Sequence, residues 1–253
     1  MKDLLHLTGR TYMVTGAASG IGRATSILLS EQGAKVVLVD INEDGLNETA
    51  SLCVRDLTYI LILDLTMPET FKGKILSCVK EIGKLNGFVH LAGMPYVSPL
   101  KTVTKEKCDL VYKVNTYAAV ELAKIFTSKK VYAGEYGSII LISSVYGIVG
   151  SPANVGYALS KGAIVGMTKA LAMEFAPKHI RVNCVAPGFI RTNMMDSVSK
   201  SFSSDYVNRL ELLHPLGLGD AKDIANSILF LFSDMSSWVT GAVLNIDGGF
   251  TAQ

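Results

Sequence analysis

Tyr157 and Lys161, four positions apart, are the pair in this sequence best suited to acid–base chemistry. Residues at i and i+4 share one face of a helix, so the phenol and the ammonium are predicted to point the same way. A tyrosine normally holds its proton up to a pH near ~10. Because a nearby positive charge favours the phenolate, we expect Lys161 to lower the pKa of Tyr157. Ser143 and Ser144, which end an apolar segment shortly before the pair, extend this candidate site of proton transfer.

A glycine-rich turn near the N-terminus is suited to bind a phosphate group. Gly16, Gly20 and Gly22 follow an apolar strand candidate and open an amphipathic helix candidate over 20–32. The first N–H groups and the positive end of a helix favour an anion. Gly16 permits a tight turn, whereas Gly20 and Gly22 keep side chains away from a ligand and from the packed helix. The strand–turn–helix context predicts a dinucleotide-binding loop, although its G-x-x-x-G-x-G spacing differs from the usual G-x-G-x-x-G.

Asp40 ends the next strand candidate, about 20 residues beyond the glycine loop. A carboxylate there is placed to bind the two hydroxyls of an adenosine ribose, and it repels a 2′-phosphate. Ile41 and Asn42, which follow it, are not basic, and Ser19 stands in the loop where a basic residue could bind a phosphate. The acidic Asp40 and the lack of basic residues beside it favour NAD(H) over NADP(H) as the cofactor.

Length and composition point to one enzyme-sized domain over residues 1–253. A chain of 253 residues, 49% of them hydrophobic, can bury a large core. Its 24 basic and 22 acidic residues are well mixed and give a formal charge of +2, which argues against a nucleic-acid partner.

Neither a metal site nor a membrane segment is expected. The cysteines and histidines are scattered without ligand spacing, which predicts reduced thiols; they are Cys53, Cys78, Cys108, Cys184, His6, His90, His179 and His214. No apolar run approaches the ~18 residues of a membrane span, and the N-terminus lacks the apolar core of a signal peptide. We therefore expect a cytoplasmic protein with no membrane partner.

Short apolar segments alternate with helical segments along the whole chain. The strand candidates are Thr11–Thr15, Lys35–Asp40, Thr58–Asp64, Gly87–Ala92, Gly137–Ser143, Arg181–Ala186 and Ala242–Ile246. The helix candidates are Gly20–Gln32, Glu43–Ser51, Pro68–Ile82, Lys105–Tyr132, Tyr157–Phe175 and Asp220–Phe232. Alternation of this kind predicts an α/β fold, a single Rossmann-type doubly wound parallel sheet of about seven strands with helices on both faces. Its ligand is expected outside the carboxyl ends of the strands.

In their order and spacing, these motifs resemble those of the short-chain dehydrogenase/reductase family over essentially the whole chain. The loop Thr15–Gly22 is similar to the family's cofactor loop, and Ile246–Gly249 to its C-terminal signature. The resemblance implies a catalytic tetrad of Asn115, Ser144, Tyr157 and Lys161. It also implies a set of cofactor-binding residues, namely Gly16, Ser19, Gly20, Ile21, Gly22, Asp40, Ile41, Asp64, Leu65, Ala92, Gly93, Tyr157, Lys161, Pro187, Gly188, Ile190 and Thr192.

The same resemblance implies a role for each member of the tetrad. Tyr157 gives or takes the proton while hydride moves between the nicotinamide and the substrate carbon. Lys161 lowers the pKa of Tyr157 and holds the ribose hydroxyls, and Ser144 hydrogen-bonds the substrate oxygen. Asn115 anchors a water that relays protons to Lys161.

Two short segments depart from the family pattern. His90 and Leu91 replace the usual Asn-Asn before Ala92, so an amide that braces the central sheet is expected to be missing. Leu218 stands where many relatives carry arginine, and any polar contact made there is expected to be lost.

The expected substrate pocket is adaptable and largely apolar. Its predicted walls are Met94, Val145, Tyr146, Val149, Phe189, Met194, Met195, Phe202 and Tyr206. A substrate loop or lid is expected at about residues 188–215. Phe202 and Tyr206 could equally belong to the apolar stripe of a local helix.

Three functions are compatible with these motifs. The favoured one is an NAD(H)-dependent oxidoreductase for a small secondary alcohol or ketone. The first alternative is a 3-oxoacyl-[acyl-carrier-protein] reductase using NADPH, and the second is a non-catalytic dinucleotide-binding regulator. The family resemblance implies a homotetramer, for which small residues on two long helices are candidate contacts: Ala118, Ala119, Ala163, Gly166 and Ala170.

Overall fold

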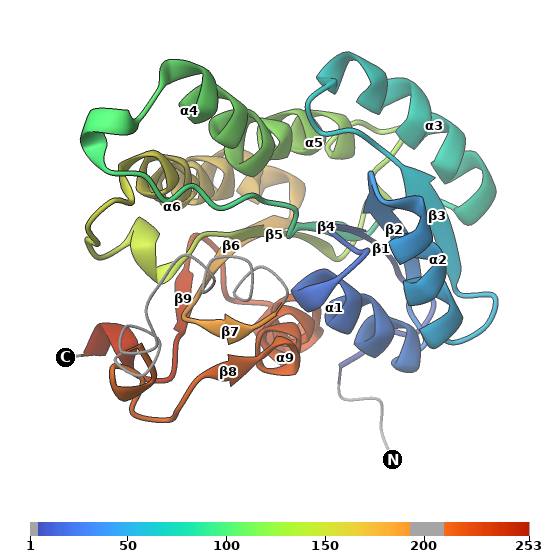
Figure 1. Ribbon diagram of the computed structural model, residues 1–253. Coiled ribbons are helices and arrows are strands. Elements are labelled where there is room, and N and C mark those ends of the chain that lie inside the picture. The colour runs from blue at the N-terminus through green and yellow to red at the C-terminus, as the bar shows by residue number, and fades with distance from the viewer. Residues whose placement is uncertain (1–4, 193–209, 253) are drawn as a thin grey trace.

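A seven-stranded parallel sheet forms the centre of the protein. The structure is a computed structural model that describes residues 5–192 and 210–252. The strand order is β3-β2-β1-β4-β5-β6-β9 (Figure 1). The strands are β1 (Thr11–Thr15), β2 (Lys35–Asp40), β3 (Thr58–Ile62), β4 (Gly87–His90), β5 (Gly137–Ile142), β6 (Ile180–Pro187) and β9 (Val243–Ile246). The predicted α/β class and Rossmann-type parallel sheet are confirmed.

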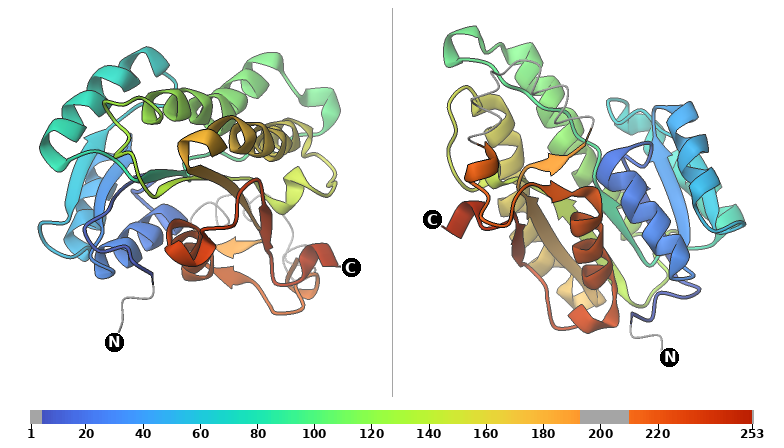
Figure 2. Two further views of the ribbon diagram at one scale, coloured as in Figure 1. Left: turned by 180° about the vertical axis from the view of Figure 1, so that it is seen from behind. Right: turned by 60° about the horizontal axis from the view of Figure 1, so that its bottom comes forward.

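Helices cover both faces of this sheet (Figures 1 and 2). One face carries α1 (Gly20–Glu31), α2 (Glu43–Leu52) and α9 (Ala221–Phe232). The other carries α3 (Phe71–Ile82), α4 (Lys105–Tyr112), α5 (Ala118–Phe126) and α6 (Val155–Phe175). Each layer encloses its own apolar cluster.

Strand β1 shows why the strand sequences are apolar at nearly every position. Its side chains point alternately to the two faces of the sheet: Met13 packs in the cluster beneath α3, α5 and α6, whereas Tyr12 and Val14 pack beneath α1 and α9. Because both faces are covered, apolar residues are favoured at every position and the usual alternation disappears.

The helix predicted over Lys105–Tyr132 is wrong in extent. Helix α4 passes into a π-helical turn, η3 (Lys113–Tyr117), before α5, which ends at Phe126. Residues beyond the helix turn back to the sheet, where Tyr132 forms a parallel bridge with Leu85. Two further strands that the sequence did not predict, β7 (Ile190–Arg191) and β8 (Gly219–Asp220), pair beside the main sheet.

The third strand ends earlier than predicted, at Ile62 rather than at Asp64. The Asp64 carboxylate turns back and accepts hydrogen bonds from the backbone N–H and the hydroxyl of Thr66, both at 2.8 Å. This local turn competes with the extended backbone that the sheet would require.

The strand order places the crevice that a ligand could use. Strand β1 lies between β2 and β4, so the chain winds outward in one direction through β2 and β3 and in the other from β4. The carboxyl ends of β1 and β4 therefore flank the switch point, where such sheets bind ligands.

Candidate active site

A cleft of about 370 Å³ opens at the carboxyl ends of β1, β2 and β4. It is lined by Gly16, Ser19, Gly20, Ile21, Gly22, Val39, Asp40, Ile41, Leu63, Asp64, Leu65, Thr66, Leu91, Ala92, Gly93, Val114 and Thr192. Twelve of the predicted cofactor-binding residues thus share one cavity. Val39, Leu63, Thr66, Leu91 and Val114 line it too and were not predicted, although all lie next to predicted positions.

The glycine loop packs too closely for side chains at two positions. At Gly16, which has φ +72°, a Cβ atom would lie 2.8 Å from the backbone nitrogen of Ala92. At Gly22 a Cβ atom would overlap the carbonyl oxygen of Gly16. The loop therefore forms a bare backbone surface at the start of α1.

Substituting Gly22 by alanine is expected to lower the free energy of unfolding by about 1–3 kcal/mol, because the methyl group forces the loop apart. Gly73→Ala is the matched control, since a Cβ atom there meets nothing within 4 Å in helix α3. That variant is expected to gain up to about 1 kcal/mol of stability. Urea unfolding measures both, and a Gly22→Ala variant as stable as the wild type would contradict the packing argument.

The N-terminus of α1 suits an anion. Within the described part of the chain, its N-cap residue Ser19 makes no side-chain capping bond, and the first turn carries no acidic side chain. The uncapped N–H groups and the helix dipole therefore face the cleft with a positive potential. The bare loop and this helix end fit the phosphates of a dinucleotide.

The Asp40 carboxylate lies at the rim of the cleft. Its Oδ1 accepts hydrogen bonds from the N–H groups of Ile41 (2.8 Å) and Asn42 (3.1 Å). Its Oδ2 accepts a bond from Ala18 N at 3.3 Å. These bonds fix a negative charge at the end of β2. Further along the rim, hydrogen bonds from Thr66 lower the pKa of Asp64.

Ser144, Tyr157 and Lys161 meet at the carboxyl end of β5. Tyr157 and Lys161 both belong to α6, and the Lys161 Nζ lies 5.8 Å from the centre of the Tyr157 ring. Lys161 is 4% exposed, and its Nζ donates a hydrogen bond to Ile142 O at 2.9 Å. Ser144 lies at the start of the turn after β5 and accepts a bond from Tyr146 N.

The predicted lowering of the Tyr157 pKa is wrong for the chain alone. Burial raises the pKa of Tyr157, and a hydrogen bond with Ser144 only partly opposes this. Burial also lowers the pKa of Lys161 to about 8. The sequence pattern shows that a lysine lies near the phenol but not that the phenol is removed from water, and here desolvation outweighs the hydrogen bond with Ser144.

Asn115 joins the same cluster from the π-helical turn. Its Oδ1 accepts a bond from Met94 N at 2.8 Å, and its Nδ2 donates to Met94 O and to Ser160 Oγ, both at 3.1 Å. A Cβ atom on Gly93 would lie 3.2 Å from Asn115 Oδ1 and 3.5 Å from Lys161 Nζ. Asn115 and Lys161 thus adjoin the cleft at Gly93, and Tyr157 and Ser144 lie beside Lys161, although none of the four predicted catalytic residues lines the cleft itself. Ser160, a partner of Asn115, was not predicted.

The brace predicted to be lost at His90 is present in another form. The His90 ring lies 3.0 Å from Thr15 Oγ1 on one side and 3.0 Å from Val114 O on the other. An imidazole carries one donor and one acceptor when neutral, so it can bridge two elements as an amide does. The amide is missing as expected, but the imidazole braces the same part of the sheet in its place.

The segment after β6 is only partly at the cleft. Thr192 lines it, whereas Pro187, Gly188 and Ile190 do not. The Ile190 side chain packs in the apolar cluster beneath α9. Ile190 can therefore meet a ligand through its backbone only.

On the substrate side, Tyr146 and Phe189 meet edge to face with ring centres 5.6 Å apart. Val145 is 1% exposed and belongs to the core, whereas Val149 is 37% exposed. Four predicted wall residues, Met194, Met195, Phe202 and Tyr206, lie outside the described residues, as does the middle of the predicted lid.

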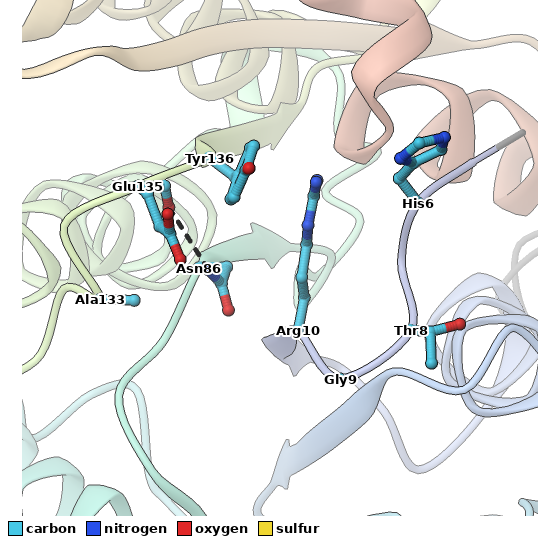
Figure 3. A pocket seen from close by; sticks show the side chains of 8 residues that line it. All are labelled: His6, Thr8, Gly9, Arg10, Asn86, Ala133, Glu135 and Tyr136. Atoms are coloured by element: carbon cyan, nitrogen blue, oxygen red, sulfur yellow. Dashed lines mark hydrogen bonds between the residues drawn. The ribbon is translucent and has the colours of Figure 1, made fainter. Parts of the chain in front are cut away.

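A second cavity, of about 480 Å³, lies at the amino ends of β1, β4 and β5; Figure 3 shows the residues that line it. Its most prominent charge, Arg10, forms two hydrogen bonds with Asp234 (2.8 and 3.0 Å) and lies 3.8 Å from the centre of the Tyr136 ring. The cavity is remote from the strand ends that carry the tetrad, and its arginine is already neutralised. The cleft at the switch point is the candidate active site.

Within residues 5–192 and 210–252, neither a membrane-spanning helix nor a cluster of metal ligands is found. None of the helices there is both long and apolar enough to span a membrane. In the same part of the chain, no three His, Cys, Asp or Glu residues are grouped as metal ligands.

The fold and the cleft define a dinucleotide-binding α/β oxidoreductase, and comparison with known proteins identifies its family. Residues 16–251 match a family model described as enoyl-(acyl carrier protein) reductase. The 3-oxoacyl-[acyl-carrier-protein] reductase FabG of Thermotoga maritima is 36% identical over 97% of this chain and 99% of its own length. The cyclopentanol dehydrogenase of Comamonas testosteroni is 34% identical over 96% and 97%. The chain belongs to the short-chain dehydrogenase/reductase family.

Solved structures show the same architecture. A putative short-chain alcohol dehydrogenase from Sinorhizobium meliloti superposes with a TM-score of 0.92 at 31% identity, covering 99% of both chains. A putative 2-deoxy-d-gluconate 3-dehydrogenase from Agrobacterium tumefaciens, solved with bound NADP, gives a TM-score of 0.90 at 29% identity over the full length of both.

Proposed function

We propose that this protein is a ketoreductase that reduces a 3-oxoacyl thioester to the 3-hydroxyacyl thioester. The observation that carries the proposal is the cluster of Ser144, Tyr157, Lys161 and Asn115, which adjoins the cleft at Gly93. Relatives named 3-oxoacyl-[acyl-carrier-protein] reductase favour the thioester over the small alcohol or ketone that the sequence first suggested.

Each residue has a defined task in such a reduction. When bound, a nicotinamide dinucleotide supplies the hydride. Tyr157 gives its phenolic proton to the substrate oxygen, and Ser144 hydrogen-bonds that oxygen as negative charge develops on it. Lys161 holds a positive charge beside the phenol. Asn115 anchors the turn through which the proton lost by Tyr157 is replaced.

The protonation states support reduction over oxidation. Because burial raises the pKa of Tyr157, the phenol keeps its proton at neutral pH and is ready to donate it. Lys161, with a pKa of about 8, changes its charge close to physiological pH and can pass a proton on.

A direct spectrophotometric assay tests which substrate the protein reduces. The purified protein is mixed with NADH or NADPH and with acetoacetyl-CoA, cyclopentanone or crotonyl-CoA, and the loss of reduced-nicotinamide absorbance is followed. We expect the highest kcat/KM with acetoacetyl-CoA. A preference for cyclopentanone would favour the secondary-alcohol dehydrogenase, the second candidate supported by the Comamonas relative. A preference for crotonyl-CoA would indicate an enoyl reductase and overturn the proposal.

The fixed charge of Asp40 supports NADH as the preferred cofactor. Asp40→Asn keeps an oxygen that can accept the bonds from Ile41 and Asn42 but removes the charge that repels a 2′-phosphate. The preference for NADH, measured as the dissociation constant of NADPH divided by that of NADH, is expected to fall about 10-fold. Asp44→Ala, a charge change at a residue of α2 that does not line the cleft, is the control and should leave the ratio unchanged. Equal shifts in both variants would assign the effect to net charge alone.

Exposed residues on the outer helices support a homotetramer, although the candidate contacts need revision. Ala118 and Ala119 are buried inside the chain and cannot contact another subunit. Gly166 has open space beside it, and Leu159 and Met173 on the same helix are 65% and 77% exposed. Ala163 and Ala170, which also lie on α6, remain candidate contacts. The central sheet includes strands from β1 to β9, which supports one domain over residues 1–253. The substrate loop at about 188–215 remains part of the proposal.

A further inference from the structure

His90 ends the central strand β4 and is 1% exposed. Its Nδ1 lies 3.0 Å from Thr15 Oγ1, and its Nε2 lies 3.0 Å from Val114 O. Thr15 directly precedes the glycine loop, and Val114 directly precedes Asn115. One side chain therefore connects the cofactor cleft to the turn that carries a predicted catalytic residue.

The hydrogen bonds around Thr15 determine which ring nitrogen carries the proton. Thr15 Oγ1 accepts bonds from Leu91 N and Ala92 N, both at 3.1 Å. A hydroxyl has two lone pairs and one proton, so its proton is left to point at His90 Nδ1. Nδ1 is then the acceptor, and Nε2–H donates to the Val114 carbonyl. The ring is neutral in this arrangement, and both of its nitrogens are used.

The acceptor of the second bond lies in an unusual part of the helix. Val114 belongs to the π-helical turn Lys113–Tyr117, and such turns leave backbone groups displaced from the regular α-helical ladder. Asn115, one residue later, is held from its other side by Met94 and Ser160. His90 thus supplies the link between this turn and β1.

We propose that His90 is a positioning residue, which in its neutral form holds the Asn115 turn and the floor of the cofactor cleft in register. The inference rests on the proposed function for the role of Asn115, but the link to the cleft is independent of the substrate. Because Thr15 also holds the backbone of Leu91 and Ala92, a change at His90 is transmitted to residues that line the cleft.

Protonation would break this link. A second proton converts Nδ1 into a donor facing a hydroxyl whose lone pairs are both occupied. The groups facing the ring are the neutral Thr15 of β1, the backbone of Val114 and Asn115, and the cationic Lys161 of α6. Burial, and then Lys161, lower the pKa of His90 to about 4. The folded pKa lies below the ordinary value of 6.5, so the unfolded chain binds the proton first and stability falls as the pH drops between these values.

Two substitutions separate hydrogen bonding from shape. His90→Asn offers one acceptor and one donor and does not titrate, whereas His90→Phe keeps a ring but offers neither. Near neutral pH, His90→Phe is expected to weaken NAD+ binding about 10-fold, because the Thr15 hydroxyl and the Val114 carbonyl lose a buried partner. His90→Asn is expected to stay within about threefold of the wild type. A purely structural role would lower stability but leave the NAD+ affinity of the folded protein unchanged.

Calorimetric titration with NAD+ and urea unfolding from neutral pH to about pH 4 measure both effects without requiring turnover. The wild type should lose stability in acid relative to His90→Asn. Wild-type affinity in His90→Phe, or equal losses of affinity in both variants, would overturn the proposal. If His90→Phe does not fold, equal acid sensitivity of the wild type and His90→Asn overturns it. An enzyme inactive on every ketone but showing these binding effects would contradict the proposed function alone.

Discussion

Replacing Tyr157 by phenylalanine is expected to lower kcat by about 10²–10⁴-fold while leaving the affinity for NADH within about threefold. The substitution removes only the phenolic oxygen, which is the group that donates the proton to the substrate. The ring itself, whose centre lies 5.8 Å from Lys161 Nζ, is retained. Steady-state reduction of acetoacetyl-CoA gives kcat, and fluorescence titration gives the dissociation constant of NADH.

Tyr112→Phe is the matched control for this experiment. Tyr112 lies at the end of α4 and is 47% exposed, so loss of its hydroxyl should leave kcat unchanged. A Tyr157→Phe variant with kcat close to that of the wild type would mean that another group donates the proton. It would also revive the non-catalytic regulator, whose response to a dinucleotide needs no phenol.

The pH dependence of reduction follows from the same residue. Because burial raises the pKa of Tyr157, the donor stays protonated throughout the neutral range. The rate of reduction should therefore fall at alkaline pH, first as Lys161 loses the positive charge beside the phenol and then as the phenol itself ionises.

The strands of the sheet were predictable because each strand is a local feature. Segments such as Lys35–Asp40 and Thr11–Thr15 are short, apolar and β-branched, and the structure reproduces both ranges. Their buried faces require apolar residues on both sides, so sequence pattern and tertiary structure agree. The glycine loop was predictable for a related reason, since its close packing excludes every side chain at Gly22.

The break in the helix between α4 and α5 was not predictable, because its causes are distant in sequence. The π-helical turn is held by His90 on β4, by the backbone of Met94 and by Ser160 on α6. None of these contacts follows from the periodicity of residues 105–132. A single asparagine within an apolar helix was the visible signal, since asparagine is a poor helix former.

The direction of the Tyr157 pKa shift was predicted wrongly for a similar reason. The i, i+4 spacing predicts that a lysine is near, but the cost of burying the phenolate of Tyr157 depends on the surrounding fold. The same limitation applies to Ala118 and Gly166. Both are small helical residues in the sequence, but Ala118 lies in the core and Gly166 lies at the surface.

Replacing Lys161 by methionine is expected to lower kcat by about 10²–10³-fold, because the reacting phenol loses the adjacent positive charge. Methionine has a similar length and is apolar, so it suits a position that is 4% exposed. Lys169→Met, on the exposed face of the same helix, is the control and should retain activity. A Lys161→Met variant with wild-type kcat would remove the lysine from the mechanism.

The same variant tests the buried charge through the pH dependence of stability. Burial lowers the pKa of Lys161 in the folded state to about 8, below its ordinary value of 10.5. Between these pH values the unfolded chain holds a proton that the folded chain has released, so wild-type stability should rise with pH. The rise attributable to this group is on the order of 1–3 kcal/mol, and the Lys161→Met variant should lack it. Urea unfolding of both proteins across this range gives the difference curve, and a flat curve would show that the ammonium is not destabilised by burial.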